Sequence, residues 1–480
     1  MGANGLPVYS EGTVGHNWVY MNGTLCLLYG TFDFSSTHPQ NTSAGTQTAP
    51  PVACPIEIES DAEITGGIFE KAVTNNGGTI YDGTFNTMVE NNVVSWGTLG
   101  KIVGGAFNGT VTNKGTISGG AFNGTVTNSG TISGGTFQNG CNVINNSTIS
   151  DGKFEGTVEN HNTISGGTFK NTCSVTNNSF INDGTFEGTV TNDTSGRIFG
   201  GTFQSTGSVT NKGNIDSNKG TFEGTVTNNG NINKGTFNGE VLNFETIANG
   251  TFWKKVTNNQ GGNITNGTFE QEVINNDGGG ISGGTFKGTV SNGNGIITGG
   301  TFAAGLSRND GSVTGGVFNG YIDVDVPRVG VYPIAVDGAS PDAKIEKVNG
   351  VSAVWDPYVV VMEGNALPEV TVTASTEIFS LNDQPLSTNP YNSRQDSTDK
   401  NTVTFTMQEG SVIIGCGGLI MTYDGYPVSS NNGNADCKGK GWSYDKNTKT
   451  LTLTDGTFNF NSTYPQNPNN GRGAKPVACA

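Results

Sequence analysis

Five polar side chains hold the same place in successive repeats of this sequence, and they include the residues best suited to acid–base chemistry. They are Glu155, Lys170, Glu187, Gln204 and Glu223, each directly after a phenylalanine. Two carboxylates about 6.5 to 9.5 Å apart can act as the acid and the base of an inverting glycosidase. If the repeats stack as β-strands, Glu155 and Glu187 would lie two layers and about 10 Å apart. The intervening Lys170 favours a ladder of solvated opposite charges over a catalytic pair.

Other patterns associated with catalysis or ligand binding are weak. The three histidines (His16, His38 and His161) are scattered, and we expect His161 to lie on the surface without an acidic or cysteine partner at metal-ligand spacing. A GxGxxG pattern at Gly278, Gly280 and Gly283 lies inside a repeat with no helix expected after it, so it does not indicate a phosphate site. The sequence therefore predicts a non-catalytic protein with no cofactor-binding and no metal-ligating residues.

The seven cysteines do not form a disulfide framework in this interpretation. Cys141 and Cys173 would share one corner of the predicted fold, with a whole repeat between them. Their Cα atoms would then lie about 10 Å apart, which is beyond the reach of a disulfide. This cysteine usage fits an anaerobic or weakly oxidising setting.

These side chains must be positioned by a repeat that is marked by phenylalanine. A Gly-x-Phe triplet recurs sixteen times between residues 67 and 318, mostly at intervals of about 15 to 17 residues. An Ile or Val precedes most of these Phe residues by five positions, and a Val or similar residue follows each by four to six. Three apolar residues cannot form a core alone, so each repeat must stack on its neighbours. The predicted core stack is Phe69, Phe107, Phe122, Phe137, Phe154, Phe169, Phe186, Phe203, Phe222, Phe237, Phe252, Phe269 and Phe286.

The position two residues after Phe indicates the cross-section of the coil. It would face inward on an unbroken Phe-to-Val strand, yet it holds Lys71, Lys254 and Gln271 as well as glycine. The chain must therefore turn between Phe and Val. We expect an all-β protein with a β-solenoid, or β-helix, of about sixteen coils, each of about 15 to 17 residues. The predicted coil is three-sided, with short strands centred on Ile, Phe and Val.

Asparagine two residues after the Val is the strongest single position. Stacked amides can donate to and accept from the coils on either side, so we interpret this row as a structural ladder. A ligand-binding stripe is the alternative. The fourteen members are Asn75, Asn91, Asn113, Asn128, Asn145, Asn160, Asn177, Asn192, Asn211, Asn228, Asn243, Asn258, Asn275 and Asn292.

Composition and charge limit the classes of molecule that this chain is expected to bind. The chain has 480 residues, 75 glycines, 33% hydrophobic residues and a net charge of −16. This thinly spread negative charge disfavours nucleic acid and anionic membranes as partners. The sequence has no apolar run of about 18 residues, so we expect no membrane insertion of this piece.

The two ends of the chain resemble each other. Residues 1–10 match residues 421–430, and Trp18 and Tyr20 match Trp442 and Tyr444. We therefore expect a piece of a longer modular array. Its predicted parts are an N-terminal β cap (1–60), the solenoid (61–320), a small β-sandwich or β-grasp-like module (321–420) and a partial second copy of the cap (421–480). At the end of the solenoid, Arg308 stands where the next Asn is expected, and the strand at residues 321–327 is predicted to cap the last coil.

Parts of the chain resemble known surface proteins. The run from YPIAVDG (332–338) to TVTFTMQEGSVII (402–414) resembles internalin B-repeat-like modules. The segment GWSYDKNTKTLTLTDG (441–456) resembles one that leads into β-helical repeats in secreted Gram-positive proteins. The resemblance implies a repeat-built bacterial protein that is extracellular or on the cell surface, usually without catalytic residues. It implies host or cell-wall glycans or proteins as partners.

Three functions are consistent with these patterns. The favoured function is a non-catalytic structural or adhesive rod that spaces or presents binding surfaces. The first alternative is a carbohydrate-binding or carbohydrate-active β-helix, which usually needs several exposed aromatic rings; Trp253 and Tyr81 are the candidates. The second is an ice-binding solenoid, because Thr-Val-Thr recurs at 110–112, 125–127, 189–191 and 225–227. Other residues interrupt that array at 142–144, 157–159, 240–242 and 272–274.

Overall fold

The computed structural model describes residues 13–14, 17–35, 51–94, 97–319, 331–336, 343–352, 358–362, 369–382, 384–386, 392–407, 412–416, 419–423, 426–429, 437–439, 442–445, 450–453 and 458–459. These residues form β-strands and turns, and no helix occurs among them. The chain divides into two compact units, residues 1–246 and 247–480. The predicted all-β solenoid is confirmed, with about 15 turns between residues 56 and 318 against the sixteen repeats expected.

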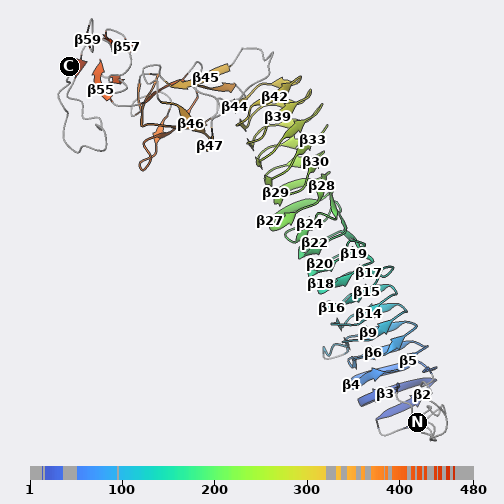
Figure 1. The fold of residues 1–480 in the computed structure, drawn as a ribbon. Coiled ribbons are helices and arrows are strands. Elements are labelled where there is room, and N and C mark those ends of the chain that lie inside the picture. Colours follow the sequence, from blue (N-terminus) through green and yellow to red (C-terminus); the bar gives the residue numbers. More distant parts are fainter. Residues whose placement is uncertain are drawn as a thin grey trace, which may run out of the picture. The chain divides into compact units, whose positions relative to one another are not determined.

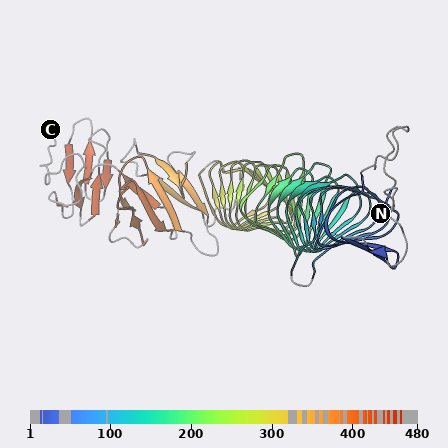
Figure 2. The same cartoon turned by 90° about the horizontal axis from the view of Figure 1, so that it is seen from below.

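A typical coil of the first unit contains three short strands, as the repeat predicts. In one coil these are β13 (Thr116–Ile117), β14 (Ala121–Phe122) and β15 (Val126–Asn128). Each pairs in parallel with the matching strand of the next coil, so that Ile117 lies beside Ile132 and Phe122 beside Phe137. Figures 1 and 2 show the strands of a unit following one another coil by coil. The repeat interval of the sequence is therefore the circumference of one coil.

In some coils the first two strands merge into one bent strand. Examples are β16 (Thr131–Phe137), β18 (Thr148–Phe154), β20 (Thr163–Phe169), β22 (Phe180–Phe186), β27 (Asn214–Phe222) and β29 (Asn231–Phe237). The register shifts at the bend, between Ile132 and Thr136 in β16. Because a shift is a local bulge, the corner between the Ile and Phe faces persists within the merged strand.

In the coil that contains β13 and β14, two neighbouring glycines form this corner, each for a different reason. Gly120 has a φ of +100°, a conformation that side chains with a Cβ rarely adopt. At its neighbour Gly119, a Cβ would lie 1.9 Å from the carbonyl oxygen of Val103 in the preceding coil. The Gly-Gly-x-Phe pattern thus places the backbones of adjacent coils in close contact at the corner.

The strand after each Phe carries the asparagine row. In the first unit these strands are β6 (Val73–Asn76), β9 (Val89–Asn92), β12 (Val111–Asn113), β15, β17 (Asn142–Asn145), β19 (Thr157–Asn160), β21 (Ser174–Asn177), β23 (Thr189–Asn192), β26 (Ser208–Asn211), β28 (Thr225–Asn228) and β30 (Val241–Asn243). Val and Asn are two residues apart, so both point inward while the residue between them faces outward.

The first coil stacks on an antiparallel hairpin. Strand β2 (Trp18–Met21) pairs antiparallel with β3 (Thr24–Asp33), and β1 (Thr13–Val14) pairs with β2. On its other side, β3 pairs in parallel with β4 (Ile56–Gly66), which places Leu25 beside Ile56 and Leu27 beside Ile58. The ladder of parallel strands therefore begins on a hairpin strand and not on an open edge, which would invite aggregation.

The second unit repeats the coil and then changes to a different sheet. Its Phe strands are β32 (Thr251–Phe252), β35 (Thr268–Phe269), β38 (Thr285–Phe286), β41 (Thr301–Phe302) and β44 (Gly316–Phe318). Its asparagine row lies on β33 (Val256–Asn258), β36 (Val273–Asn275), β39 (Val290–Asn292) and β42 (Leu306–Asn309). Strand β44 pairs antiparallel with β48 (Tyr358–Met362), which covers the last coil strand. The segment expected to cap it, 321–327, lies outside the described residues.

Two sheets after the solenoid enclose one core. One contains β48, β45 (Val331–Val336), β54 (Val412–Cys416) and β50 (Ile378–Leu381). The other is five-stranded, in the order β47 (Val351–Ser352), β46 (Ile345–Val348), β49 (Glu369–Ala374), β53 (Thr402–Thr406) and β52 (Arg394–Gln395). Ile334 and Ile414 of the first sheet and Val372 and Phe405 of the second belong to the same buried cluster. This arrangement fits the predicted small β-sandwich.

Two small sheets follow the sandwich. One consists of β56 (Tyr426–Ser429), β55 (Leu419–Tyr423) and β60 (Phe458–Asn459). The other consists of β57 (Cys437–Gly439), β58 (Trp442–Asp445) and β59 (Thr450–Leu453). All strand pairs within these two sheets are antiparallel.

Candidate functional site

The asparagine row is the most regular feature of the interior. All fourteen predicted residues have no exposed surface. Within each unit, the Nδ2 of one Asn donates a hydrogen bond to the Oδ1 of the Asn in the next coil at 2.7 to 2.8 Å. The structure thus places these side chains inside the coils, where they bond to one another.

Each amide also binds the backbone at the turn that follows. Asn128 Nδ2 donates to the carbonyl oxygen of Gly130 at 3.1 Å and to that of Thr148 in the next coil at 3.1 Å. The donors and the acceptor of the side chain are therefore used within the protein. A buried polar group costs free energy unless it is hydrogen-bonded, so a different residue type at this position would leave its neighbours without partners.

The row continues one coil further than predicted. Arg308 does not take the place of Asn, because a bulge shifts the register between Val290 and Ser291. Asn309 therefore pairs with Asn292 and accepts its amide hydrogen bond at 2.7 Å. The expectation that the row ends at Asn292 is wrong. In the other coils the Asn follows the Val by two residues, whereas Asn309 follows Leu306 by three. A search that allowed this longer spacing would have found Asn309 in the sequence.

The row begins where an apolar residue takes the same place. Ile58 of the first coil pairs in register with Asn75. Ile58 has no polar atom in its side chain, and the buried Oδ1 of Asn75 has no hydrogen-bond partner among the described residues. The first asparagine is thus a ladder end that is held on one side only.

The phenylalanine rings form a second internal stack. Consecutive rings within each unit lie 4.6 to 4.8 Å apart between centroids, with their planes inclined by 3° to 13°. The strand spacing of about 4.8 Å imposes this face-to-face geometry. The stack contains the predicted residues and also Phe85, Phe302 and Phe318. At the start of the first unit Phe34 packs edge-on against Phe69, at 5.5 Å and 77°.

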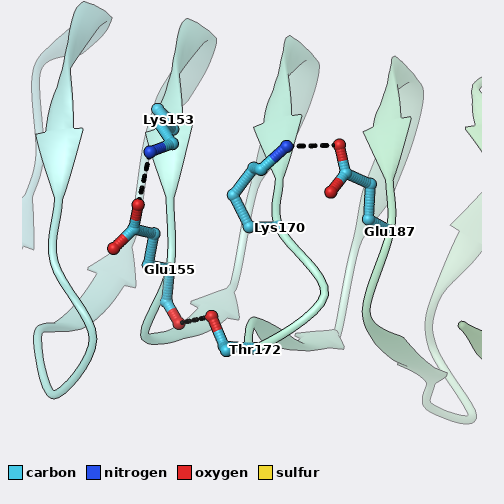
Figure 3. Close-up of polar contacts among 5 residues, drawn as sticks. All are labelled: Lys153, Glu155, Lys170, Thr172 and Glu187. Carbon is cyan, nitrogen blue, oxygen red and sulfur yellow. Dashed lines mark hydrogen bonds and ion pairs between the residues drawn. The ribbon is translucent and has the colours of Figure 1, made fainter. Parts of the chain in front are cut away.

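The acidic residues that could have done chemistry form ion pairs on the outer surface. Lys170 Nζ lies 2.6 Å from Glu187 Oε1 in the adjacent coil, as expected for a charge ladder. Figure 3 shows this pair reaching from one coil to the next. Glu155 pairs with Lys153 of the same coil and not with Lys170; its Oε1 lies 2.5 Å from Lys153 Nζ. Glu223 accepts a hydrogen bond from Asn238 Nδ2 at 2.8 Å. Glu155, Glu187 and Glu223 therefore each have a different partner, and no two of them share one.

His161 lies on the surface, as expected, but it has one acidic neighbour that the sequence analysis did not name. Its Nε2 lies 3.1 Å from Glu159 Oε1, and both side chains are exposed. The two residues flank the buried Asn160, so both point outward and meet on the surface. His16 and His38 lie outside the described residues. Gly280 begins β37 (Gly280–Ile281), a strand of the coil, so the GxGxxG pattern does not precede a helix.

Cys141 and Cys173 are both free thiols and both buried. The predicted absence of a disulfide between them is confirmed. The Sγ of Cys141 donates to the carbonyl oxygen of Gly124 at 3.0 Å. Burial raises the pKa of each thiol to about 12, so neither is a ready thiolate nucleophile. In the part of the chain that the structure describes, no group of three or more His, Cys, Asp or Glu residues could hold a metal ion.

Several aromatic rings face the solvent. Trp253 and Tyr81 are 50% and 45% exposed, as their outward positions suggest. Sequence reasoning missed Phe180 and Phe199, which are 41% and 39% exposed and have ring centroids 6.1 Å apart. Phe180 directly precedes Ile181, whereas Phe199 directly follows Ile198. The rings therefore stand on either side of the inward Ile row, in adjacent coils.

The outward threonines do not form a continuous flat array. Thr127 pairs in register with Ile144, Ile144 with Glu159, and Glu159 with Thr176. An apolar and an acidic side chain thus interrupt the row for two successive coils. This geometry gives no support to the ice-binding alternative.

Comparisons with known proteins add no assignment to this geometry. The described residues contain no helix long and apolar enough to span a membrane. No protein-family model, curated protein or solved structure matches this chain.

Proposed function

We propose that this chain is a non-catalytic structural or adhesive segment of a modular bacterial surface protein, located outside the cell. Its coils would space or present binding surfaces. The observation that carries this proposal is that the buried asparagines, from Asn75 onward, spend their hydrogen bonds on one another. Inward amides that bond to one another and to the backbone have no free donor or acceptor for a ligand. Within the row, Asn75 Oδ1 alone lacks a partner among the described residues, and Asn75 has no exposed surface. Contact with partners then falls to the outward rows and to the module after the coils.

The equivalence of the coils supports a spacing role. From Phe69 to Phe302, each Phe of the stack is followed by one Asn of the row, and adjacent coils repeat these contacts at almost constant distance. A change in the number of coils alters the length of such a stack but not its internal chemistry. The resemblance of the run 332–414 to internalin B-repeat-like modules supports the surface location.

Deletion of a whole coil tests the spacing role. Residues 116–130 form one repeat, because Thr116 pairs in register with Thr131. Their removal should leave a folded protein, and small-angle X-ray scattering should show its largest dimension shortened by about 5 Å. Removal of residues 116–122 alone is the matched control and should disrupt folding, since it takes out two of the three strands of a coil. A whole-coil deletion that unfolds the protein would contradict interchangeable coils.

An assay for polysaccharide cleavage tests the non-catalytic part of the proposal. The protein should release no reducing ends from polygalacturonate or from a β-glucan. Release that disappears in Glu187→Gln or Glu155→Gln would overturn the proposal and assign acid–base chemistry to the outer row. The same variants should leave the circular dichroism spectrum unchanged, since both side chains lie on the surface.

The exposed phenylalanine pair favours carbohydrate binding as a second candidate function. Phe180 and Phe199 offer ring faces on which a sugar could stack, and the exposed Arg197 lies beside Phe180 in register. Affinity electrophoresis in gels that contain a soluble β-glucan would show retardation that is lost in Phe180→Ala and Phe199→Ala. Phe244→Ala changes a similarly exposed ring elsewhere and is the control. Equal mobility of all variants would remove this candidate.

A further inference from the structure

The two copies of the cap sequence form the same hairpin. In the first copy, β2 and β3 pair antiparallel with Trp18 opposite Leu27 and Tyr20 opposite Leu25. In the second copy, β58 and β59 pair antiparallel with Trp442 opposite Leu453 and Tyr444 opposite Leu451. The matched residues therefore hold the same register, although the turn is two residues longer in the second copy. Local sequence determines this hairpin whatever follows it.

In the first copy, the second strand of the hairpin starts the solenoid. Leu28 N–H donates to the carbonyl oxygen of Asn17 at 2.8 Å, on the side of β2. Leu25 N–H donates to the carbonyl oxygen of Pro55 at 3.0 Å, on the side of β4. Because successive residues of a strand direct their N–H groups to opposite sides, Leu27 also faces β4. Strand β3 thus joins an antiparallel hairpin to a parallel ladder.

In the second copy, the described part of the chain places no strand beside the matching edge. Strand β59 is the outer strand of the sheet β57, β58, β59 in the part of the chain that the structure describes. By the shared register, the N–H groups of Leu451 and Leu453 face away from β58. An exposed row of backbone donors and acceptors is a template for a further strand.

The sequence around this edge also repeats that of the first copy. The motif PVAC stands at residues 51–54, directly before the Pro55 and Ile56 that pair with β3, and it recurs at 476–479. The spacing from the hairpin is nearly equal: Leu27 precedes Pro51 by 24 residues, and Leu453 precedes Pro476 by 23 residues. A strand joined behind Cys479 would therefore approach β59 as β4 approaches β3.

We propose that β59 is the acceptor edge for the first strand of a further solenoid. It takes an Ile-x-Ile strand of the kind at residues 56–58, in parallel and in the β3–β4 register. The occupant is a coil segment attached behind Cys479 of the same polypeptide. The β4 strand of a second molecule is a poorer occupant, since it already pairs with its own β3. The proposal goes beyond a spacing or adhesive function and does not depend on it.

The test uses the full chain extended by a second set of coils. Residues 55–320 are attached behind Cys479 in place of Ala480, and hydrogen–deuterium exchange is followed by mass spectrometry. The attached coils should exchange as slowly as the original ones. Leu451→Pro removes one N–H from the open edge but none that bonds to β58, and it should speed exchange in the first attached coil by roughly tenfold or more. Leu25→Pro is the matched control and should affect only the original first coil.

Two further measurements make the result decisive. If Leu451→Pro also unfolds β58 and β59, residues 442–453 are replaced by residues 18–27, the hairpin of the first copy. Restored protection of the attached coil supports the proposal, and loss of protection beside an intact hairpin overturns it. Unchanged protection in Leu451→Pro would also overturn it. So would a concentration-dependent dimer of the 480-residue chain that Leu451→Pro abolishes, because the edge would then bind a second copy.

Discussion

Two rows of asparagine run through the same coils but on opposite sides of the backbone. Asn113 and Asn128 belong to the buried row, and Asn108 and Asn123 belong to an outer row directly after Phe. The amide hydrogen bond is 2.7 Å from Asn113 to Asn128 and 2.8 Å from Asn123 to Asn108. The buried row keeps asparagine from Asn75 to Asn292, whereas the outer row changes to Gln138, Glu155 and Lys170.

The difference between the rows lies in burial and not in bond length. An outer side chain that loses its partner can bond to water, so the net value of its hydrogen bond is small. An inner side chain has no water to replace the partner, and a missing bond leaves buried groups unsatisfied. The sequence is therefore constant where desolvation makes substitution costly and varies where it does not.

The largest difference in stability is expected between substitutions of two adjacent aromatic residues, one that faces inward and one that faces outward. Phe252 is fully buried in the ring stack, whereas Trp253 is 50% exposed. Phe252→Ala should lower the free energy of unfolding by about 4 kcal/mol, because it removes a core ring and leaves a cavity. Trp253→Ala should change it by less than about 1 kcal/mol. Urea denaturation of both variants measures this, and equal losses would contradict the assigned faces.

A charge placed in each asparagine row should give the next largest difference. Asn128→Asp puts a carboxylate among the acceptors Asn145 Oδ1, Gly130 O and Thr148 O. An uncompensated buried charge should cost about 3 kcal/mol, and Asn123→Asp on the outside of the same coil should cost less than about 0.5 kcal/mol. Urea denaturation at neutral pH measures both. A similar loss in both variants would show that the two rows do not differ in environment.

The pH dependence of Asn128→Asp sharpens this test. Burial without a counter-charge favours the neutral acid, so the pKa of the new carboxyl in the folded state should exceed its unfolded-state value. Stability should then be lost as the pH rises through the folded-state pKa and recover as the pH falls toward the unfolded-state value of about 4. Denaturation midpoints measured across that window check the sign. A stability that falls with decreasing pH would contradict a buried position.

Most of the coil could be predicted from the sequence because its inward residues are few in kind. The spacing of Ile, Phe, Val and Asn identified three strands, the ring stack and the buried row. The continuation of the buried row to Asn309 was missed, because a one-residue bulge places this Asn one residue later than the fixed spacing predicts. The ion pair of Lys153 with Glu155 was also missed, because long flexible side chains can reach several neighbours and sequence spacing does not identify which one they contact. The strand that covers the last coil, β48, lies well beyond the last Gly-x-Phe triplet in the chain, and no repeat predicts it.

Removal of an amide from the buried row should have a moderate effect. Asn128→Ala takes the acceptor from Asn113 Nδ2 and the donor from Asn145 Oδ1. We expect a loss of about 2 kcal/mol for the unsatisfied neighbours, and Asn160→Ala should behave in the same way. Asn123→Ala is the outer control and should cost less than about 0.5 kcal/mol. Thermal denaturation of the three variants checks the order, and an unchanged Asn128→Ala would place this side chain in solvent.

The smallest effect should come from the ion pairs of the outer row. Lys170 and Glu187 lie in adjacent coils with their charged atoms 2.6 Å apart, and both side chains are partly exposed. Water and salt screen such a pair, so a double-mutant cycle with Lys170→Met and Glu187→Gln should give a coupling of about 0.2 to 1 kcal/mol. The coupling should fall when the salt concentration is raised from low to about 1 M, at which the screening length is about 3 Å. Lys212 and Asp193, which are 3.2 Å apart and more exposed, should give a smaller coupling and serve as the control.

A coupling well above the range of exposed ion pairs, as large as the loss expected for Asn128→Ala, would mean that the outer row is specified as strongly as the buried one. The contrast between the two rows would then no longer hold.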